Sequence, residues 1–206
     1  MKAVIFDLDG VIVSTDHLHY EAWLKVSQEE GLVFNHDINS YLRGVSREAS
    51  LDMILTHNNT TMSVSQKQDI LTRKNNYYLE SIQTLTPEDM LDGIPDVLSM
   101  LKDRKLKLAI GSSSKNAKHI LQYLGLSDFF DAVCDGTMII NSKPDPEVFL
   151  LAANMLGVQP EDCVVIEDAA SGVIAAKNAN MKVYGVGEAV QHHDVDGSLF
   201  NFIVSL

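Results

Sequence analysis

The chain has 206 residues, and its apolar fraction of 46% provides for a sizeable core. A formal net charge of −12 argues against nucleic acid as a partner, because nucleic-acid affinity comes largely from neutralising phosphates. No apolar run reaches the roughly eighteen residues of a membrane span, and no signal peptide opens the chain, so we expect a cytoplasmic protein without a membrane segment. The two cysteines, Cys134 and Cys163, are expected to be buried hydrophobic residues rather than a disulfide.

Five short apolar segments predict the strands of a parallel sheet. They cover residues 3–6, 106–110, 132–134, 163–166 and 183–186. Segments that are apolar at every position are typical of strands covered on both faces. Between them, helix-like segments begin near Ile94 and cover roughly residues 116–124, 146–156 and 171–179. This alternation predicts an α/β core, a Rossmann-like, doubly wound parallel sheet.

Residues 15–83 interrupt the alternation and contain no clear strand. Within them, Ser65 with Gln68 three residues later predicts a capping box at the start of a long helix. We therefore predict an all-helical cap at 15–83, inserted into a catalytic core formed by residues 1–14 and 84–206. Both connections fall near the end of the first strand, so the cap is expected over the carboxyl edge of the sheet, where open α/β sheets bind ligands.

Acidic pairs follow two of the predicted strands. Asp7 and Asp9 come at the end of the first strand, and Glu167 and Asp168 follow the strand at 163–166. Paired carboxylates at strand ends can share a divalent cation, and one can attack phosphorus while another transfers a proton. Taken alone, each pair could equally be a turn with capping side chains.

Two further motifs could bind an anion. Ser112 follows the second strand in the sequence GSSSKN at 111–116, where its hydroxyl and nearby backbone N–H groups could hold a phosphate or simply cap a helix. Lys143 lies in the sequence SKPDP at 142–146 and could neutralise a transferring phosphoryl group. On its own, Lys143 would be interpreted as a surface lysine.

Together, these four motifs resemble those of the haloacid-dehalogenase-like phosphotransferase superfamily, and the resemblance spans essentially the whole chain. It implies that Asp7 forms an aspartyl-phosphate and that Asp9 is the general acid and base. Ser112 and Lys143 would bind the transferring phosphoryl group. The implied cofactor is Mg²⁺, held by Asp7, the backbone carbonyl of Asp9, and Asp168, with Glu167 close by.

The predicted cap narrows the resemblance to the β-phosphoglucomutase family. Residues 42–51 (LRGVSREASL) look like the cap signature of that family, and residues 19–23, 74–75 and 114–116 also match it. By this resemblance, Arg47 clamps the non-transferring phosphate of the substrate, and Trp23 and Leu42 face the sugar. A forked guanidinium and an aromatic face suit these tasks, although Arg47 alone could be an exposed helix start and Trp23 a core residue. The other implied pocket residues are His19, Gly44, Val45, Ser46, Ser50, Lys74, Ser114, Lys115 and Asn116.

The resemblance implies a mutase that converts β-glucose 1-phosphate to glucose 6-phosphate through a bound glucose 1,6-bisphosphate. One alternative is a phosphatase of the same superfamily, which would pass the phosphoryl group to water. Another is a non-catalytic phosphosugar-binding protein, against which the intact Asp7, Asp9, Lys143 and Asp168 argue. We expect the protein to be a monomer and its ligand to be a small sugar phosphate.

Two segments near the end of the chain depart from these motifs. The sequence QHHD at 191–194 resembles a metal motif but lacks a helical i, i+4 pair, so it is interpreted as a surface loop. Residues 200–206 are shorter than the strand and helix expected there.

Overall fold

The computed structural model describes residues 1–42 and 45–206, and these form two compact units. Met1–Ser14 and Thr86–Leu206 make up the first, here called the core unit. Thr15–Leu85 make up the second, here called the helical unit. The sequence predicts an insert that ends at residue 83, and the helical unit ends two residues later, at Leu85.

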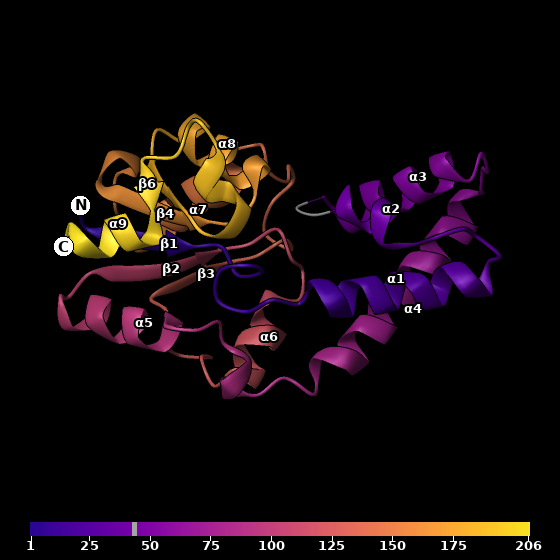
Figure 1. The fold of residues 1–206 in the computed structure, drawn as a ribbon, viewed down its shortest axis with the longest axis horizontal. Helices are drawn as coiled ribbons and strands as arrows, with labels where there is room; N and C mark the ends of the chain where they lie inside the picture. The colour runs from indigo at the N-terminus through magenta and orange to yellow at the C-terminus, as the bar shows by residue number, and fades with distance from the viewer. Residues whose placement is uncertain (43–44) are drawn as a thin grey trace. The chain divides into compact units, whose positions relative to one another are not determined.

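Six parallel strands form one sheet in the core unit, in the order β3-β2-β1-β4-β5-β6 (Figure 1). In chain order the strands are β1 Ala3–Phe6, β2 Lys107–Gly111, β3 Ala132–Cys134, β4 Cys163–Glu167, β5 Lys182–Gly185 and β6 Gly197–Ser198. The first strand lies inside the sheet, where Phe6 pairs with Ile110 of β2 and with Ile166 of β4. The predicted parallel α/β sheet is confirmed.

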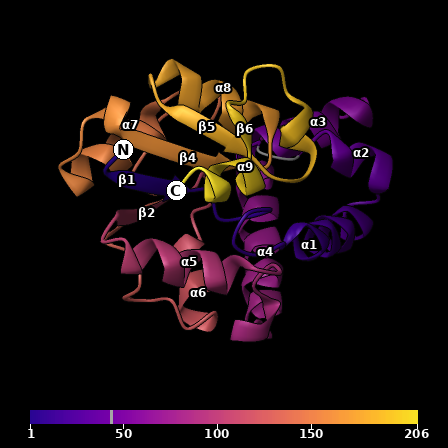
Figure 2. The same ribbon diagram turned by 60° about the vertical axis from the view of Figure 1, so that its left-hand side comes forward.

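Helices cover both faces of this sheet, with α7 and α8 on one side and α5 and α6 on the other (Figures 1 and 2). The helices of the core unit are η1 Pro87–Asp89, α5 Ile94–Asp103, α6 Ala117–Tyr123, α7 Glu147–Leu156, η2 Pro160–Asp162, α8 Ala170–Asn178, η3 Gly187–Gln191 and α9 Leu199–Val204. Under α7 and α8, a hydrophobic cluster joins Ile5 and Val165 of the sheet to Phe149 and Val173 of the helices. Burial on both faces explains why the strands are apolar at every position. Both cysteines are free and buried.

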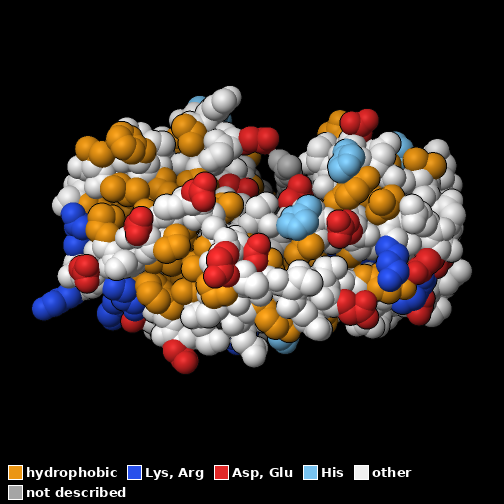
Figure 3. All heavy atoms as spheres, turned by 60° about the horizontal axis from the view of Figure 1, so that its bottom comes forward, with side chains coloured by type: hydrophobic (Ala, Val, Ile, Leu, Met, Phe, Trp, Pro, Cys, Tyr) orange, Lys and Arg blue, Asp and Glu red, His pale blue; other side chains and the backbone are white. Residues whose placement is uncertain are grey.

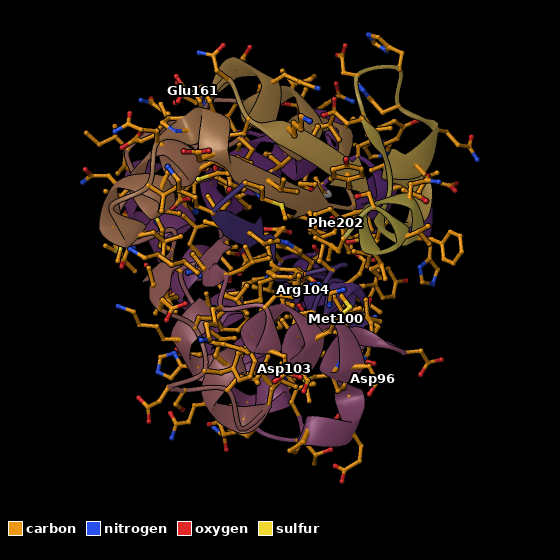
Figure 4. The ribbon with its side chains drawn as sticks, turned by 90° about the vertical axis from the view of Figure 1, so that its left-hand side faces the viewer. Asp96, Met100, Asp103, Arg104, Glu161 and Phe202 are labelled. Atoms are coloured by element: carbon orange, nitrogen blue, oxygen red, sulfur yellow. The ribbon has the colours of Figure 1, made fainter. Side chains whose placement is uncertain are left out.

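The helix α5 shows how an amphipathic sequence is oriented on the sheet. Its buried side chains are Ile94, Val97, Leu98 and Leu101. Asp96 and Asp103 lie on its exposed side (Figure 4). Pro95 stands in the first turn, as expected, where the N–H that proline lacks would have had no partner within the helix.

The last residues contribute a short strand and a short helix. The two-residue strand β6 pairs with β5 and was not predicted, because Gly197 and Ser198 form no apolar run. The Ser198 hydroxyl accepts a hydrogen bond from the Asn201 backbone and begins α9. Phe202 on α9 is buried, and its ring centroid lies 5.1 Å from that of Tyr184 (Figure 4). The closing strand and helix are therefore both present, in short form.

The described part of the helical unit contains α1 Asp16–Glu29, α2 His36–Ser40, α3 Arg47–His57 and α4 Val64–Ile82. The predicted capping box at Ser65 and Gln68 is wrong. The capping box forms two residues earlier. The Ser63 backbone N–H donates to Gln66 Oε1 at 3.0 Å, and the Ser63 hydroxyl accepts from the Gln66 backbone N–H at 3.3 Å. Both sequence pairs fit the motif, and the earlier pair lets α4 begin at Val64.

Across residues 1–42 and 45–206, no helix combines the length and the hydropathy that a membrane span requires. On the face drawn in Figure 3, Asp and Glu side chains are spread over the surface, while Lys and Arg gather in small separate groups. This distribution agrees with the formal net charge of −12.

Candidate active site

The predicted catalytic residues of the core unit follow the carboxyl ends of three neighbouring strands. Asp7 comes directly after β1, Ser112 directly after β2, and Asp168 directly after β4. The in-register pairing of β1 with both neighbours brings these strand ends to the same edge of the sheet. This edge is where open α/β sheets carry their ligands.

Lys143 joins two of the acidic side chains at this edge. Its Nζ atom lies 2.7 Å from Asp7 Oδ1 and 2.6 Å from Glu167 Oε1. All three side chains are buried, so Lys143 is not the surface lysine that its sequence alone would suggest. Burial disfavours a charged Lys143, but the attraction of Asp7 and Glu167 outweighs burial and raises its pKa. The ammonium is therefore held in its charged form beside Asp7.

Asp7, Glu167 and Asp168 offer ligand atoms that all lie within 4.8 Å of one another. Burial raises the pKa of Asp7 to about 7, although the ammonium of Lys143 opposes the shift. Burial also raises the pKa of Asp168 to about 8, and the charges of Asp7, Glu167 and Asp9 add to this effect. When they are ionised, these three carboxylates carry more negative charge than one lysine can balance. Clustered carboxylate oxygens of this kind fit a divalent cation such as Mg²⁺.

Glu167 has less freedom to bind a metal than its two neighbours. Its Oε1 accepts a hydrogen bond from Lys143, and its Oε2 accepts one from the Ala169 backbone at 2.7 Å. Each of its oxygens thus already shares one lone pair with a protein donor, which leaves fewer sites for a metal ion. Asp7 and Asp168 are therefore the stronger candidates for ligands, with Glu167 fixing Lys143 in place.

Asp9 and Gly10 form the bend that follows β1. Asp9 is partly buried, and its charge contributes to the raised pKa of Asp168, which places the two carboxylates near each other. Gly10 has φ of +82°, and a Cβ atom added there would lie 2.1 Å from Asp168 Oδ2. Only glycine allows both this backbone conformation and this close approach.

The loop from Ser112 to Asn116, here called the serine loop, is held by its own hydroxyl groups. Ser112 Oγ accepts a hydrogen bond from the Ser114 backbone at 3.1 Å, and Ser114 Oγ accepts one from the Asn116 backbone at 3.2 Å. The buried Ser112 also donates its backbone N–H to Cys134 at 3.0 Å. Because Ser112 Oγ accepts within the loop, its own hydrogen remains to be donated, as binding of a phosphoryl oxygen requires. Lys115 in the same loop is exposed.

In the helical unit, Arg47 is the first residue of α3, and the Ser46 hydroxyl caps that helix by accepting from the Ala49 backbone at 3.2 Å. Arg47 is partly buried, and burial lowers the pKa of its guanidinium from the usual value, while Glu48 and Tyr78 oppose this shift. Within the described residues, no ion pair joins Arg47 to a carboxylate. A partly desolvated guanidinium without an ion-pair partner is a suitable binding group for an external phosphate.

The partly buried His19 and the buried Lys74 form a pair in the helical unit. Lys74 Nζ lies 2.7 Å from His19 Nδ1, and the imidazole stacks on Tyr78 with ring centroids 4.0 Å apart. Burial, followed by the charges of Lys74 and Arg47, lowers the pKa of His19 well below its usual value. His19 is therefore neutral and accepts a hydrogen bond from Lys74. Tyr78 was not among the predicted site residues, although its position four residues after Lys74 on α4 places both side chains on one helix face.

The other predicted cap residues occupy different environments. Trp23 and Leu42 belong to the hydrophobic cluster of the helical unit and are 3% and 8% exposed. Ser50 is also buried, whereas Val45 is partly exposed. Contact of Trp23 and Leu42 with a sugar stays a prediction, and Gly44 lies outside the described residues.

The histidines of the QHHD sequence lie where a surface loop was expected, between η3 and β6. His193 Nε2 is 3.3 Å from Asp194 Oδ2, and His192 Nδ1 is 3.9 Å from the same oxygen. The ligand atoms of these three residues lie within 4.8 Å of one another, but His193 and Asp194 are exposed.

Comparison with known proteins identifies the family. The profile of the haloacid dehalogenase-like hydrolases matches residues 1–180. The β-phosphoglucomutase of Bacillus subtilis is 46% identical over 190 residues, which cover 91% of this chain and 84% of that protein. A phosphorylated carbohydrates phosphatase of Thermotoga maritima is 34% identical over 190 residues, covering 90% and 85% of the two chains.

A solved structure agrees with the sequence comparison. The crystal structure of β-phosphoglucomutase from Clostridium difficile superposes with a TM-score of 0.93 at 38% identity, covering 100% of this chain and 96% of that one. The similarity thus extends over both units of the chain rather than over the catalytic motifs alone. The chain belongs to the haloacid dehalogenase-like hydrolase superfamily and, within it, to the β-phosphoglucomutase family.

Proposed function

We propose that this chain is a β-phosphoglucomutase that interconverts β-glucose 1-phosphate and glucose 6-phosphate through glucose 1,6-bisphosphate. Family membership supports this activity, and the paired Asp7 and Lys143 support its chemistry. The roles of individual residues given below are part of the proposal.

The reaction would proceed in two phosphoryl transfers with Asp7 as the covalent carrier. In the first, the bond between phosphorus and Asp7 breaks, phosphorus bonds to the free hydroxyl of the sugar phosphate, and Asp9 takes the hydroxyl proton. The bisphosphate then presents its other phosphate. Asp7 attacks that phosphorus, the bond to the sugar oxygen breaks, and Asp9 returns the proton to the leaving oxygen.

The remaining residues of the core unit would stabilise charge during each transfer. Lys143 lies at hydrogen-bond distance from Asp7, so its ammonium can stabilise the oxygens of the transferring group, and Ser112 can donate its hydroxyl hydrogen to them. Asp7, the Asp9 carbonyl and Asp168 would hold Mg²⁺, with Glu167 beside them. Bound Mg²⁺ would neutralise phosphoryl charge and offset the repulsion among these carboxylates.

Arg47 is the observation that most favours a mutase over a phosphatase. A mutase must bind a bisphosphate at both ends, whereas a phosphatase needs only one phosphate site. The partly buried guanidinium, without an ion-pair partner in the described residues, is suited to the second site. We propose that Ser114, Lys115 and Asn116 of the core unit are further substrate-binding residues.

The phosphatase alternative rests on one specific finding, the similarity to a carbohydrate phosphatase of Thermotoga maritima. Both activities would use Asp7 in the same way, so the catalytic motifs alone do not separate them. Measurement of glucose 6-phosphate and inorganic phosphate from the same reaction distinguishes the two. A monomeric state and a cytoplasmic location stay predictions of the sequence.

A further inference from the structure

The turn that follows β3 lies directly against the serine loop. Residues 135–138 form this turn, here called the backing turn, in which the Met138 N–H donates to the Asp135 carbonyl at 3.0 Å. The Gly136 backbone donates to the carbonyl of Ser114 at 3.1 Å. A Cβ atom added at Gly136 would lie only 2.2 Å from the carbonyl oxygen of Ser113. The two backbones therefore touch, and the shape of the backing turn limits the positions open to the serine loop.

The carboxylate of Asp135 fixes the shape of the backing turn. Asp135 is 2% exposed, and its Oδ1 accepts hydrogen bonds from both the backbone and the hydroxyl of Thr137, the former at 2.9 Å. Its Oδ2 lies 3.7 Å from Nζ of Lys118, which is in the first turn of α6. One buried carboxylate thus connects the backing turn to the helix that begins at the end of the serine loop. Burial of a carboxylate requires hydrogen-bond donors, and Thr137 supplies two of them, whereas Lys118 is largely exposed.

We propose that Asp135 is a positioning residue that holds the serine loop in its substrate-binding conformation. It would act through Thr137 and Gly136 on Ser114, and through Lys118 on the start of α6. The inference rests on the proposed function, because it takes Ser114 and Asn116 to be substrate contacts. Binding groups must be held to a fraction of an ångström to be effective, so loss of this support would weaken substrate binding.

Three variants test the proposal. Asp135→Ala removes the carboxylate, and Asp135→Asn keeps an oxygen that can accept from Thr137. Asp131→Ala is the matched control, since Asp131 precedes the same strand and its carboxylate accepts from the Leu108 backbone at 2.7 Å. It lies at the other end of β3, away from the serine loop.

The first measurement is backbone hydrogen exchange, which needs no substrate. We expect Asp135→Ala to accelerate exchange at Ser114 and Asn116 by about tenfold or more, the effect of weakening one hydrogen bond. Asp135→Asn should stay within about threefold of the wild type. Unchanged exchange in Asp135→Ala, or equal acceleration in Asp131→Ala, would overturn the positioning role.

The second measurement is kinetic. Asp135→Ala should raise the KM for β-glucose 1-phosphate about tenfold, while kcat and the rate of Asp7 phosphorylation by acetyl phosphate change less than about threefold. Asp135→Asn should restore most of the KM. Accelerated exchange with an unchanged KM would contradict the proposal. Absence of mutase turnover in the wild type would instead refute the proposed function, and the exchange measurement would still decide whether Asp135 positions the loop.

A milder variant covers the case in which Asp135→Ala does not fold. Thr137→Val removes only the hydroxyl that donates to Asp135 and leaves the backbone donor in place. It should accelerate exchange at Ser114 and Asn116 and raise KM, each by roughly two- to fivefold. No change in either quantity would count against the proposal.

Discussion

Lys143 Nζ lies 2.7 Å from Asp7 Oδ1, and both side chains are buried. The ammonium partly neutralises the carboxylate at Oδ1 and does not occupy Oδ2. Burial still raises the pKa of Asp7 to about 7, so the ammonium offsets only part of the cost of desolvating the charge. The site therefore combines a carboxylate, a fixed cation and further acidic groups that attract a metal ion, as a phosphoryl-transfer nucleophile requires.

Asp7→Asn should reduce turnover by more than about a thousandfold, because an amide neither attacks phosphorus nor binds Mg²⁺ well. Steady-state assay and recovery of labelled phosphate on the protein measure the effect. The matched control is Asp103→Asn on the exposed side of α5, which should retain wild-type activity. Labelled phosphate recovered on another residue of the wild type would contradict the assignment.

Asp9→Asn should lower kcat by about 10² to 10⁴ while leaving substrate and metal affinity nearly unchanged, since its proposed side-chain role is proton transfer. The backbone carbonyl proposed to bind Mg²⁺ is retained in this variant. Single-turnover kinetics and Mg²⁺ titration separate the two effects. Wild-type turnover in Asp9→Asn would assign the acid and base role to another group.

Arg47→Ala should weaken binding of glucose 1,6-bisphosphate by about 10- to 100-fold, the range for hydrogen bonds to a charged group. It should also increase release of inorganic phosphate, because a poorly held bisphosphate leaves before its second transfer. Arg47→Lys should restore only part of the affinity, since an ammonium cannot form the paired hydrogen bonds of a guanidinium. Unchanged affinity in Arg47→Ala would remove Arg47 from the site.

The metal-free protein should become less stable as pH rises from about 4 to about 8. The pKa values of Asp7 and Asp168 are raised to about 7 and about 8 in the folded state, above the value of 3.8 for an unperturbed aspartate. The folded state therefore binds more protons than the unfolded state in this window, and stability falls with increasing pH. Mg²⁺ should replace those protons, so it should raise Tm more at pH 8 than at pH 5.5.

Scanning calorimetry with and without Mg²⁺ measures this difference. Asp168→Asn removes one titrating carboxylate and one proposed ligand, so it should reduce both the pH dependence and the Mg²⁺ effect. A Mg²⁺-induced rise in Tm that is equal at both pH values would contradict the linkage.

Much of the fold could be predicted from sequence because the sheet is covered on both faces. Strands such as β1 and β4 are apolar throughout, so their positions were clear and their bounds differed from the prediction by at most one residue. The strand β6 could not be predicted, because Gly197 and Ser198 have no pattern of their own and pair only with an existing edge. At the start of α4, two overlapping Ser-x-x-Gln pairs were equally suitable, and only the folded structure distinguishes them.

In the candidate site too, some residues could be placed from the sequence and others could not. Asp7 and Asp168 could be predicted because each directly follows a strand of the sheet. The burial of Lys143 depends on the path of the connection between β3 and α7, which its sequence does not encode locally. Tyr78 was missed for the same reason, since its stacking on His19 is set by packing. The hydrogen bonds of Asp135 to Thr137 are local, but the contact of its turn with the serine loop, through Gly136 and Ser114, is again set by packing.

The central claim is that the phosphoryl group on Asp7 passes to a sugar hydroxyl rather than to water. One assay tests it most directly: incubation with β-glucose 1-phosphate, Mg²⁺ and a trace of glucose 1,6-bisphosphate, with glucose 6-phosphate and inorganic phosphate measured together. We predict that glucose 6-phosphate accumulates with little inorganic phosphate. Release of inorganic phosphate at a rate equal to or above that of glucose 6-phosphate formation would contradict the mutase assignment and favour a phosphatase.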